Sequence, residues 1–438
     1  MNVESFRCSL CGRVVKIKER SDAPILDPSM GFGVCKNCIK ELYEFIMEDE
    51  HAKAHSHKLT FADTLGDLLE KNKPHVIKEY LDEFIIEQER AKKILSVAVY
   101  NHYKRMKYGL DHAGTDDEID KSNVIILGPT GCGKTALLSH LSKLLDIPFA
   151  VTDASSLTEA GFVGADVEVA VRNLYYAAGQ DIEKTEHGII YLDEFDKIAR
   201  KSGENNSITA DPGHEGVQQG LLKMLEGSVV EFTARGQRKH PEAPTIKVDT
   251  RNILFIVGGA FVGIDKIVAK RVRKGESNLG FGADIQPKDD SDAKFNEFIH
   301  QVRPEDLMKY GIIPEIIGRL PVICTLETLD EHALLRILTE PKNAPVKQYQ
   351  KLLAMDNVQL EFEEAALLAV AKKAIERKTG ARSLKGIIED TMLNVMFDIP
   401  KSNKPRKVIV TEACINDGAE PQIIFLADET QDNAEVAD

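Results

Sequence analysis

Short apolar runs alternate with helical patterns through the middle of the chain. Runs of mostly apolar residues bounded by glycine, proline or polar residues are typical of buried strands. Between several of these runs, apolar residues recur three or four positions apart, which is typical of amphipathic helices. The predicted strands lie at residues 124–127, 149–152, 188–192, 252–257 and 321–326. This alternation predicts an α/β fold with a parallel sheet covered by helices.

Different patterns flank this central region. Residues 87–106 predict a long amphipathic helix, and the chain after residue 326 predicts a second, smaller and mostly helical unit. Two strand-like runs close that unit, at residues 407–410 and 422–426. The last residues contain five acids and no bases, which is typical of a disordered tail. We therefore divide the chain into a small module at 1–48, a flexible linker at 49–62, a large domain at 63–320, a small domain at 321–426 and an acidic tail at 427–438.

Composition narrows the class of protein. The chain has 438 residues, which suits two or three domains, and a hydrophobic fraction of 43%, which is ordinary for a globular protein. Its net charge of −14 argues against a sequence-independent nucleic-acid binder, which is normally basic. The polar start lacks a secretory signal, and no apolar run is long enough to span a membrane. We expect a cytoplasmic protein with no nucleic-acid or membrane partner.

Four of the seven cysteines form two closely spaced pairs. Each pair has two residues between its cysteines, and 23 residues separate the pairs. Two such pairs can complete a tetrahedron around Zn²⁺, and an all-cysteine set indicates a structural rather than a catalytic site. A redox motif and chance clustering are the alternatives. The predicted zinc ligands of the N-terminal module are Cys8, Cys11, Cys35 and Cys38.

The stretch "GPTGCGKT" follows the first predicted strand and precedes a helical run at residues 136–145. Glycines at this spacing let backbone N–H groups surround phosphates at a helix N-terminus. Lys134 is expected to reach the β- and γ-phosphates of ATP, and Thr135 to hold Mg²⁺. The predicted nucleotide-binding residues are Gly128, Pro129, Thr130, Gly131, Cys132, Gly133, Lys134, Thr135 and Ala136.

An acidic pair ends a later buried strand, in the stretch "GIIYLDEFDKI". Asp193 is placed to bind Mg²⁺ indirectly, as aspartates at this position of nucleotide-binding folds do. Glu194 is the candidate base that orients the attacking water. An acidic pair alone is often only a solvated strand end. Together with the glycine-rich loop, it predicts that the chain hydrolyses ATP.

Several longer segments carry a family resemblance, among them "AVYNHYKR", "EGVQQGLLKMLEG" and "GRLP". From the cysteine module to about residue 425, the chain resembles the ClpX family of AAA+ ATPases, the unfoldase subunits of the Clp protease. The resemblance implies a homohexameric ring that uses ATP to pull tagged or unfolded proteins through a central pore. It also implies delivery to the ClpP peptidase and adaptor proteins that bind the zinc module.

The resemblance assigns further residues to the nucleotide site. Arg319 matches the arginine finger, which reaches the nucleotide of the neighbouring subunit. Arg382 matches the sensor arginine of the small domain, which lies over the nucleotide of its own subunit. Ile85 and Ile86 match the apolar lining of the adenine pocket. The strand that ends "LFIVGGAF" offers no polar residue that matches the family's first sensor.

The resemblance also assigns the loops that meet the substrate and the peptidase. The first pore loop corresponds to Gly161, Phe162, Val163 and Gly164, and the second to residues 201–214. A charged cluster at the pore entrance corresponds to Arg238, Lys239 and His240. The loop that docks on ClpP corresponds to Leu279, Gly280 and Phe281.

The chain departs from the family pattern at three points. Glu87 replaces a common glycine, and we expect altered pocket geometry there because glutamate disfavours backbone angles that glycine adopts. Phe162 replaces the usual tyrosine, and the gap between the cysteine pairs is longer than usual. Two other functions remain alternatives: a remodelling chaperone that docks no peptidase, and a zinc-bearing nucleic-acid motor. The loop at Leu279–Phe281 argues against the first, and the acidic charge argues against the second.

Overall fold

The computed structural model describes residues 5–16, 34–40, 61–112, 118–158, 165–199, 212–233, 245–275, 291–401 and 406–426. The chain divides into two compact units, Met1–Asp67 and Leu68–Asp438. The acidic tail and nearly all of the predicted linker lie outside the described residues, although helix α2 (Phe61–Lys71) begins just inside the linker's expected end. Among the described helices, none combines the length and apolarity that a membrane crossing requires.

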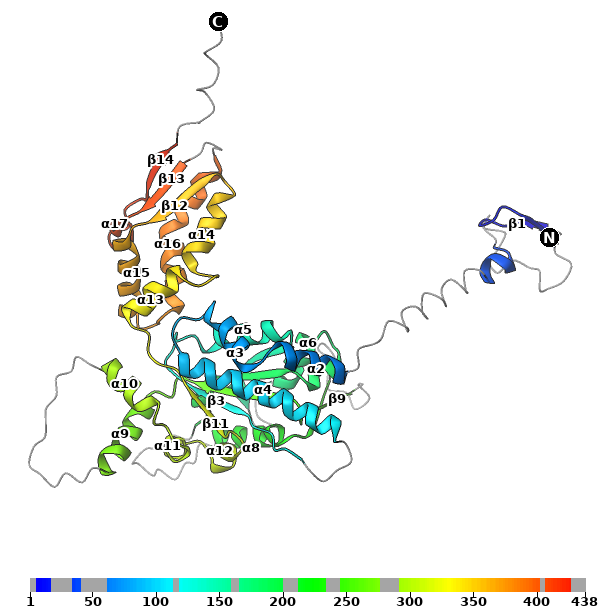
Figure 1. Ribbon diagram of the computed structural model, residues 1–438, viewed down its shortest axis with the longest axis horizontal. Helices are drawn as coiled ribbons and strands as arrows, with labels where there is room; N and C mark the ends of the chain where they lie inside the picture. The colour runs from blue at the N-terminus through cyan, green and yellow to red at the C-terminus, as the bar shows by residue number, and fades with distance from the viewer. Residues whose placement is uncertain are drawn as a thin grey trace, which may run out of the picture. The chain divides into compact units, whose positions relative to one another are not determined.

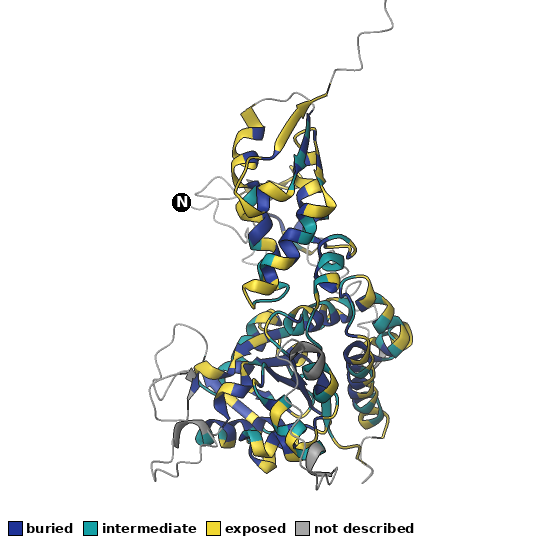
Figure 2. Cartoon of the chain, turned by 90° about the vertical axis from the view of Figure 1, so that its left-hand side faces the viewer, coloured by how far each residue is buried: buried dark blue, intermediate teal, exposed yellow. Residues whose placement is uncertain are grey.

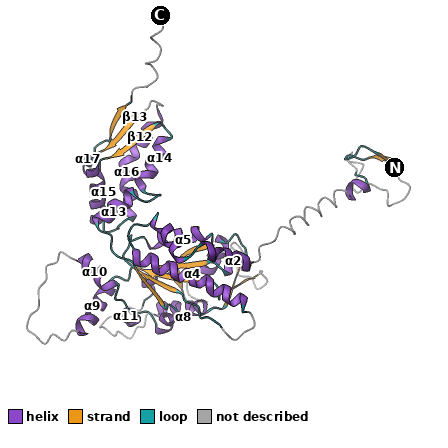
Figure 3. Ribbon diagram, in the orientation of Figure 1, coloured by secondary structure: helices purple, strands orange, loops and turns teal. Residues whose placement is uncertain are grey.

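The second unit is built around one parallel five-stranded sheet, as the sequence predicts (Figure 1). The strand order is β11-β3-β10-β7-β4, and every neighbouring pair is parallel. Figure 3 shows these strands among the surrounding helices. The strands are β3 (Val124–Leu127), β4 (Phe149–Asp153), β7 (Ile189–Asp193), β10 (Leu254–Gly259) and β11 (Val322–Thr325).

The inner strands β3, β7 and β10 are almost wholly buried because helices cover the sheet. All residues of β3 and β10 are buried, which explains their continuous apolar sequence (Figure 2). Each fully buried isoleucine or leucine contributes roughly 1.5–3 kcal/mol to folding. The carboxyl ends of all five strands meet at one edge of the sheet, which is where parallel α/β folds bind ligands.

Helices precede and connect the strands. The long helix α4 (Glu89–Asp111) packs against β11, and its buried residues Ala91, Leu95, Val99 and Tyr103 recur at helical spacing. Two small strand pairs accompany the main sheet, β5 (Leu157–Thr158) with β6 (Ala165–Asp166) and β8 (Val229–Thr233) with β9 (Thr245–Asp249). The remaining helices are α3 (Pro74–Asp82), α5 (Lys134–Leu145), α6 (Val169–Ala177), α7 (Ile182–Glu186), α8 (Pro212–Glu226), α9 (Ile264–Gly275), α10 (Ser291–Ile299), α11 (Pro304–Tyr310) and α12 (Pro314–Gly318).

A mostly helical region with its own hydrophobic core follows β11. It contains the helices α13 (Glu331–Thr339), α14 (Pro345–Ala354), α15 (Glu364–Glu376), α16 (Arg382–Asp398) and α17 (Glu412–Asn416). Its sheet has the order β12-β13-β14, formed by β12 (Val358–Phe362), β13 (Arg406–Val410) and β14 (Gln422–Phe425). Because β11 belongs to the large sheet, a boundary after residue 320 would cut that sheet. We place the boundary after Leu326.

The N-terminal module contributes two short antiparallel strands, β1 (Ser5–Arg7) and β2 (Val14–Lys16). A helical turn follows at residues 36–40. Among the described residues of this module, the buried cluster consists of Cys8, Cys35, Cys38 and Val34, and the partly buried Val15 and Ile39 pack against it. So small a core gives little apolar stabilisation, which is typical of domains that a bound metal holds together.

Candidate nucleotide and metal sites

The glycine-rich loop lies at the carboxyl edge of the large sheet, between β3 and the first turn of α5. Gly131 and Gly133 have φ values of +80° and +101°, a region that glycine adopts readily. The Nζ atom of Lys134 donates to the carbonyl oxygens of Gly128 at 2.6 Å and Pro129 at 2.9 Å. The ammonium group therefore lies over the loop. A cationic side chain and a helix N-terminus here suit the phosphates of a nucleotide.

A segment of the small domain closes against this loop. The backbone N–H of Ala381 donates to the carbonyl oxygen of Gly131 at 3.1 Å. A Cβ atom at Gly131 would lie 2.1 Å from the carbonyl oxygen of Thr379, so any larger residue would separate the two segments. Arg382, the first residue of α16, directly follows this contact and is exposed. Its position beside the loop fits the sensor role that the family resemblance predicts.

The acidic pair at the end of β7 faces the same loop. The hydroxyl of Thr135 lies 3.4 Å from the Oδ2 atom of Asp193. A hydroxyl beside a carboxylate oxygen suits Mg²⁺, which usually takes one or two protein ligands and keeps several waters. Glu194 follows with an exposed side chain and a φ of +54°. Its backbone N–H donates to Asp193 Oδ1 at 2.9 Å.

The predicted adenine-pocket residues lie in a tight turn before α4. Ile85 and Ile86 are buried, with 8% and 7% of their surface exposed. Glu87 and Gln88 follow with φ values of +56° and +58°. The expectation that glutamate would avoid the backbone angles of the replaced glycine is therefore wrong: Glu87 adopts the left-handed region at a cost of roughly 1–2 kcal/mol.

Two interactions accompany this strained turn. The side-chain amide of Gln88 donates to the carbonyl oxygen of Glu327 at 3.1 Å and accepts from the N–H of Glu327 at 2.9 Å. This two-way bond fixes the turn to the segment that joins the large and small domains. Burial raises the pKa of the Glu87 carboxyl, and the nearby Asp330 carboxylate raises it further. Sequence reasoning assigned Gln88 no role, because its partner lies 239 positions away.

Arg319 lies at the opposite end of the sheet from the glycine-rich loop. The side chain of Asn123, just before β3, donates to the carbonyl oxygen of Arg319 at 3.0 Å. The loop begins after the four residues of β3, roughly 13 Å further along the strand axis. The guanidinium group of Arg319 is exposed and pairs with Glu226 at 2.9 Å. Arg319 therefore does not contact the glycine-rich loop of its own chain.

The four predicted metal ligands converge in the N-terminal module. Their sulfur atoms all lie within 4.8 Å of one another. The Sγ–Sγ distances are 3.9 Å for Cys8–Cys38 and 3.8 Å for Cys11–Cys35. A tetrahedral ZnS₄ centre with Zn–S bonds of about 2.3 Å has sulfurs roughly 3.8 Å apart. Hydrogen bonds from the backbone N–H groups of Cys11 and Cys35 lower the pKa of Cys8, whereas the hydrogen bond with the Cys11 side chain raises the pKa of Cys38.

We expect one tightly bound zinc per chain, lost on the substitution Cys35→Ser. Removing one of four thiolates opens the tetrahedron, and the small core of the module cannot replace the lost stabilisation. Elemental analysis after dialysis, with thiol labelling of the native protein, measures this. Cys414→Ser is the matched control, because Cys414 is buried elsewhere and should leave the metal content unchanged. Absence of zinc from the unchanged chain, with all four thiols reactive, would contradict the assignment.

Several predicted functional segments lie outside the described residues. These are the first pore loop at Gly161–Gly164, most of the second pore loop, the cluster Arg238–His240 and the docking loop Leu279–Phe281. Their roles remain predictions from the family resemblance.

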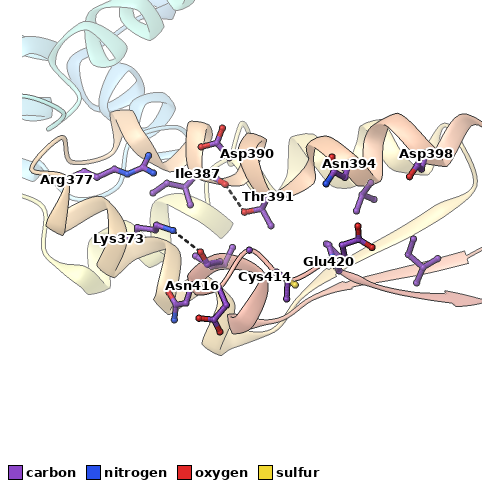
Figure 4. Close-up of a pocket in the computed structure, with 17 residues that line it drawn as sticks. Lys373, Arg377, Ile387, Asp390, Thr391, Asn394, Asp398, Cys414, Asn416 and Glu420 are labelled. Carbon is purple, nitrogen blue, oxygen red and sulfur yellow. Dashed lines mark hydrogen bonds between the residues drawn. The ribbon is translucent and has the colours of Figure 1, made fainter.

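A separate cleft of about 410 Å³ lies in the small domain, between α15, α16 and the α17–β14 turn (Figure 4). Charged residues of both signs line it, including Lys373, Arg377, Asp390 and Glu420. The Nζ atom of Lys373 donates to the carbonyl oxygen of Ile415 at 2.8 Å, so it supports the local fold. No lining residue belongs to the glycine-rich loop or the acidic pair, and we assign the cleft no part in nucleotide binding.

Comparison with known protein families matches two consecutive parts of the chain. Residues 119–323 match a model described as AAA domain (Cdc48 subfamily). Residues 329–410 match a model described as the C-terminal, D2-small domain, of ClpB protein. The first match contains the five-stranded sheet, the glycine-rich loop and the acidic pair almost completely, and the second covers most of the small domain.

Proposed function

We propose that the chain is a ClpX-type protein unfoldase. It is an ATPase, and its matches to an AAA domain and a D2-small domain point to the Clp/Hsp100 family of AAA+ proteins. In this proposal a homohexamer uses ATP to unfold tagged proteins and passes them to the ClpP peptidase. The observation that carries the proposal is the contact between the small domain and the glycine-rich loop at Gly131. Through this contact, changes at the nucleotide can move one domain relative to the other, which is the motion that a mechanical ATPase needs.

The residues around the loop have separate roles in hydrolysis. Lys134 and the loop N–H groups would bind the phosphates, Thr135 would hold the magnesium ion, and Asp193 would contact that ion indirectly. When bound, Mg²⁺ neutralises charge that develops on the phosphate oxygens. Glu194 would orient a water and accept its proton, since its side chain is exposed and it directly follows Asp193 at the end of β7. Arg382 stabilises the nucleotide from the small-domain side.

The position of Arg319 supports assembly into a ring. It lies at the far end of β3 from its own loop, and its guanidinium group is exposed on the surface. An arginine that stabilises transition-state charge must then come from a neighbouring copy.

The unfolding and delivery steps rest on segments known here only by sequence. Phe162, between glycines, supplies an aromatic ring that can grip a translocating chain. Arg238, Lys239 and His240 can attract a carboxylate-bearing tag. Leu279 and Phe281 can bury their side chains in apolar pockets on ClpP, with the zinc module available for adaptor proteins.

The experiment that tests this class of function offers the purified chain a stable, tagged fluorescent protein. We expect ATP-dependent loss of fluorescence, and a faster ATPase when an unfolded tagged protein is added. Single- or double-stranded DNA should leave the ATPase rate unchanged. Stimulation by DNA alone, with no unfolding, would replace the proposal with a nucleic-acid motor.

A further inference from the structure

Tyr191 is a completely buried tyrosine beside the magnesium-binding residues. It belongs to β7, two positions before Asp193, so the two side chains lie on the same face of the sheet. Its hydroxyl donates to the Oδ1 atom of Asp193 at 3.0 Å. A phenolic hydroxyl has an ordinary pKa of about 10, so it is a hydrogen-bond donor at neutral pH.

This contact divides the two oxygens of the Asp193 carboxylate between different partners. Oδ1 accepts from the Tyr191 hydroxyl and from the backbone N–H of Glu194. Oδ2 faces the hydroxyl of Thr135. Rotation of the carboxylate about its last bond would break both hydrogen bonds to Oδ1. Asp193 is thus held with one particular oxygen toward the expected magnesium position.

The neighbouring strand leaves room for the tyrosine. Gly258 lies in β10, next to the strand that carries Tyr191, and a Cβ atom there would lie 2.5 Å from the Tyr191 hydroxyl. The adjacent Gly259 likewise leaves space for the Asp196 side chain, because a Cβ atom at Gly259 would lie 2.2 Å from Asp196 Oδ1. These glycines occupy the strand end that offers no polar sensor residue in the sequence. Polar groups from β7 and the turn after it fill that space instead.

We propose that Tyr191 is a positioning residue of the ATPase site, which fixes the Asp193 carboxylate for magnesium binding through its hydroxyl, with Gly258 providing the space. Hydrogen bonds to groups that hold a metal typically change metal affinity or activity 10–100-fold when they are removed. The inference concerns ATP hydrolysis alone. It holds whether or not the chain unfolds proteins.

The test measures ATPase rate against Mg²⁺ concentration for Tyr191→Phe, without any protein substrate or peptidase. We expect the Mg²⁺ concentration for half-maximal rate to rise about 10-fold. ATP binding in the presence of a chelator should stay unchanged, because the phosphate-binding loop is intact. Tyr103→Phe is the matched control: Tyr103 is also buried, and its hydroxyl donates to the backbone carbonyl of His187 at 3.1 Å. That control should keep the magnesium dependence of the unchanged chain.

A second variant tests the same geometry from the neighbouring strand. Gly258→Ala should displace the Tyr191 ring and produce the same shift toward higher Mg²⁺ concentration. Thermal unfolding of each variant separates this effect from a loss of stability. An unchanged magnesium dependence in Tyr191→Phe would overturn the proposal. So would a fall in rate that persists at saturating Mg²⁺ and that Tyr103→Phe also shows.

Discussion

The substitution Glu194→Gln is expected to leave ATP binding intact and to slow hydrolysis at least ~100-fold, the scale of a lost general base. Glutamine has nearly the same shape as glutamate, so the turn at φ +54° and the N–H bond to Asp193 remain. Only the proton-accepting carboxylate disappears. Nucleotide titration and steady-state ATPase assays on the same preparation measure the two effects separately.

A matched control places the same chemical change elsewhere. Glu364→Gln alters an exposed glutamate in the first turn of α15 and should hydrolyse ATP at the normal rate. Near-normal turnover by Glu194→Gln would remove Glu194 from the mechanism. Loss of ATP binding in that variant would mean that Glu194 binds the nucleotide rather than acting as the base.

The substitution Arg319→Ala should lower ATP hydrolysis roughly 10³-fold, the lower range for an arginine finger. Nucleotide binding and folding should persist, since the Arg319 side chain is exposed and its ion pair is with the exposed Glu226. Exposed ion pairs contribute at most about 1 kcal/mol to stability. A thermal unfolding curve close to that of the unchanged chain would show that the lost rate is not a folding defect.

Mixing the two inactive variants separates action within a chain from action between chains. A subunit with Arg319→Ala still has the intact loop and Glu194, and a subunit with Glu194→Gln still has Arg319. Where the two subunits meet, these groups together form one complete site. We expect the mixture to regain a measurable fraction of the ATPase rate. If Arg319 acted within its own chain, every site in the mixture would lack one group and the activity would stay absent.

The inner strands of the large sheet, β3, β7 and β10, could be predicted because burial on both faces leaves continuous apolar runs. Strand β12 was missed for the opposite reason. Its residues alternate between buried and exposed, in the sequence Val358-Gln359-Leu360-Glu361-Phe362, and it lies between helices. Its place is fixed by pairing with β13, whose residues lie about 50 positions later, and pairing over such distances leaves no local signal. Strand β11 was predicted from its apolar run, but the expected domain boundary after residue 320 separated it from β3, with which it pairs.

In the candidate nucleotide site, too, short local motifs could be predicted from the sequence, whereas contacts between distant segments could not. The glycine-rich loop and the acidic pair could be located because each is a short motif at a strand end. The Gln88–Glu327 bond and the close approach of Gly131 to Thr379 join distant segments, so only the fold reveals them. Tyr191 is an intermediate case. Its spacing of two from Asp193 places both on one face of a strand, but the space for its ring depends on Gly258 in another strand.

The most direct test of the proposed function combines the purified chain, ClpP, ATP and a stably folded tagged protein. We predict degradation that requires both ATP and ClpP. The same reaction with Phe281→Ala should retain ATP hydrolysis and unfolding but lose degradation, because the docking loop keeps too little apolar surface to bind ClpP. If the tagged protein is unfolded yet never degraded by the unchanged chain with ClpP, the chain is a stand-alone remodelling chaperone. If it is neither unfolded nor degraded while ATP is consumed, the proposed function is wrong.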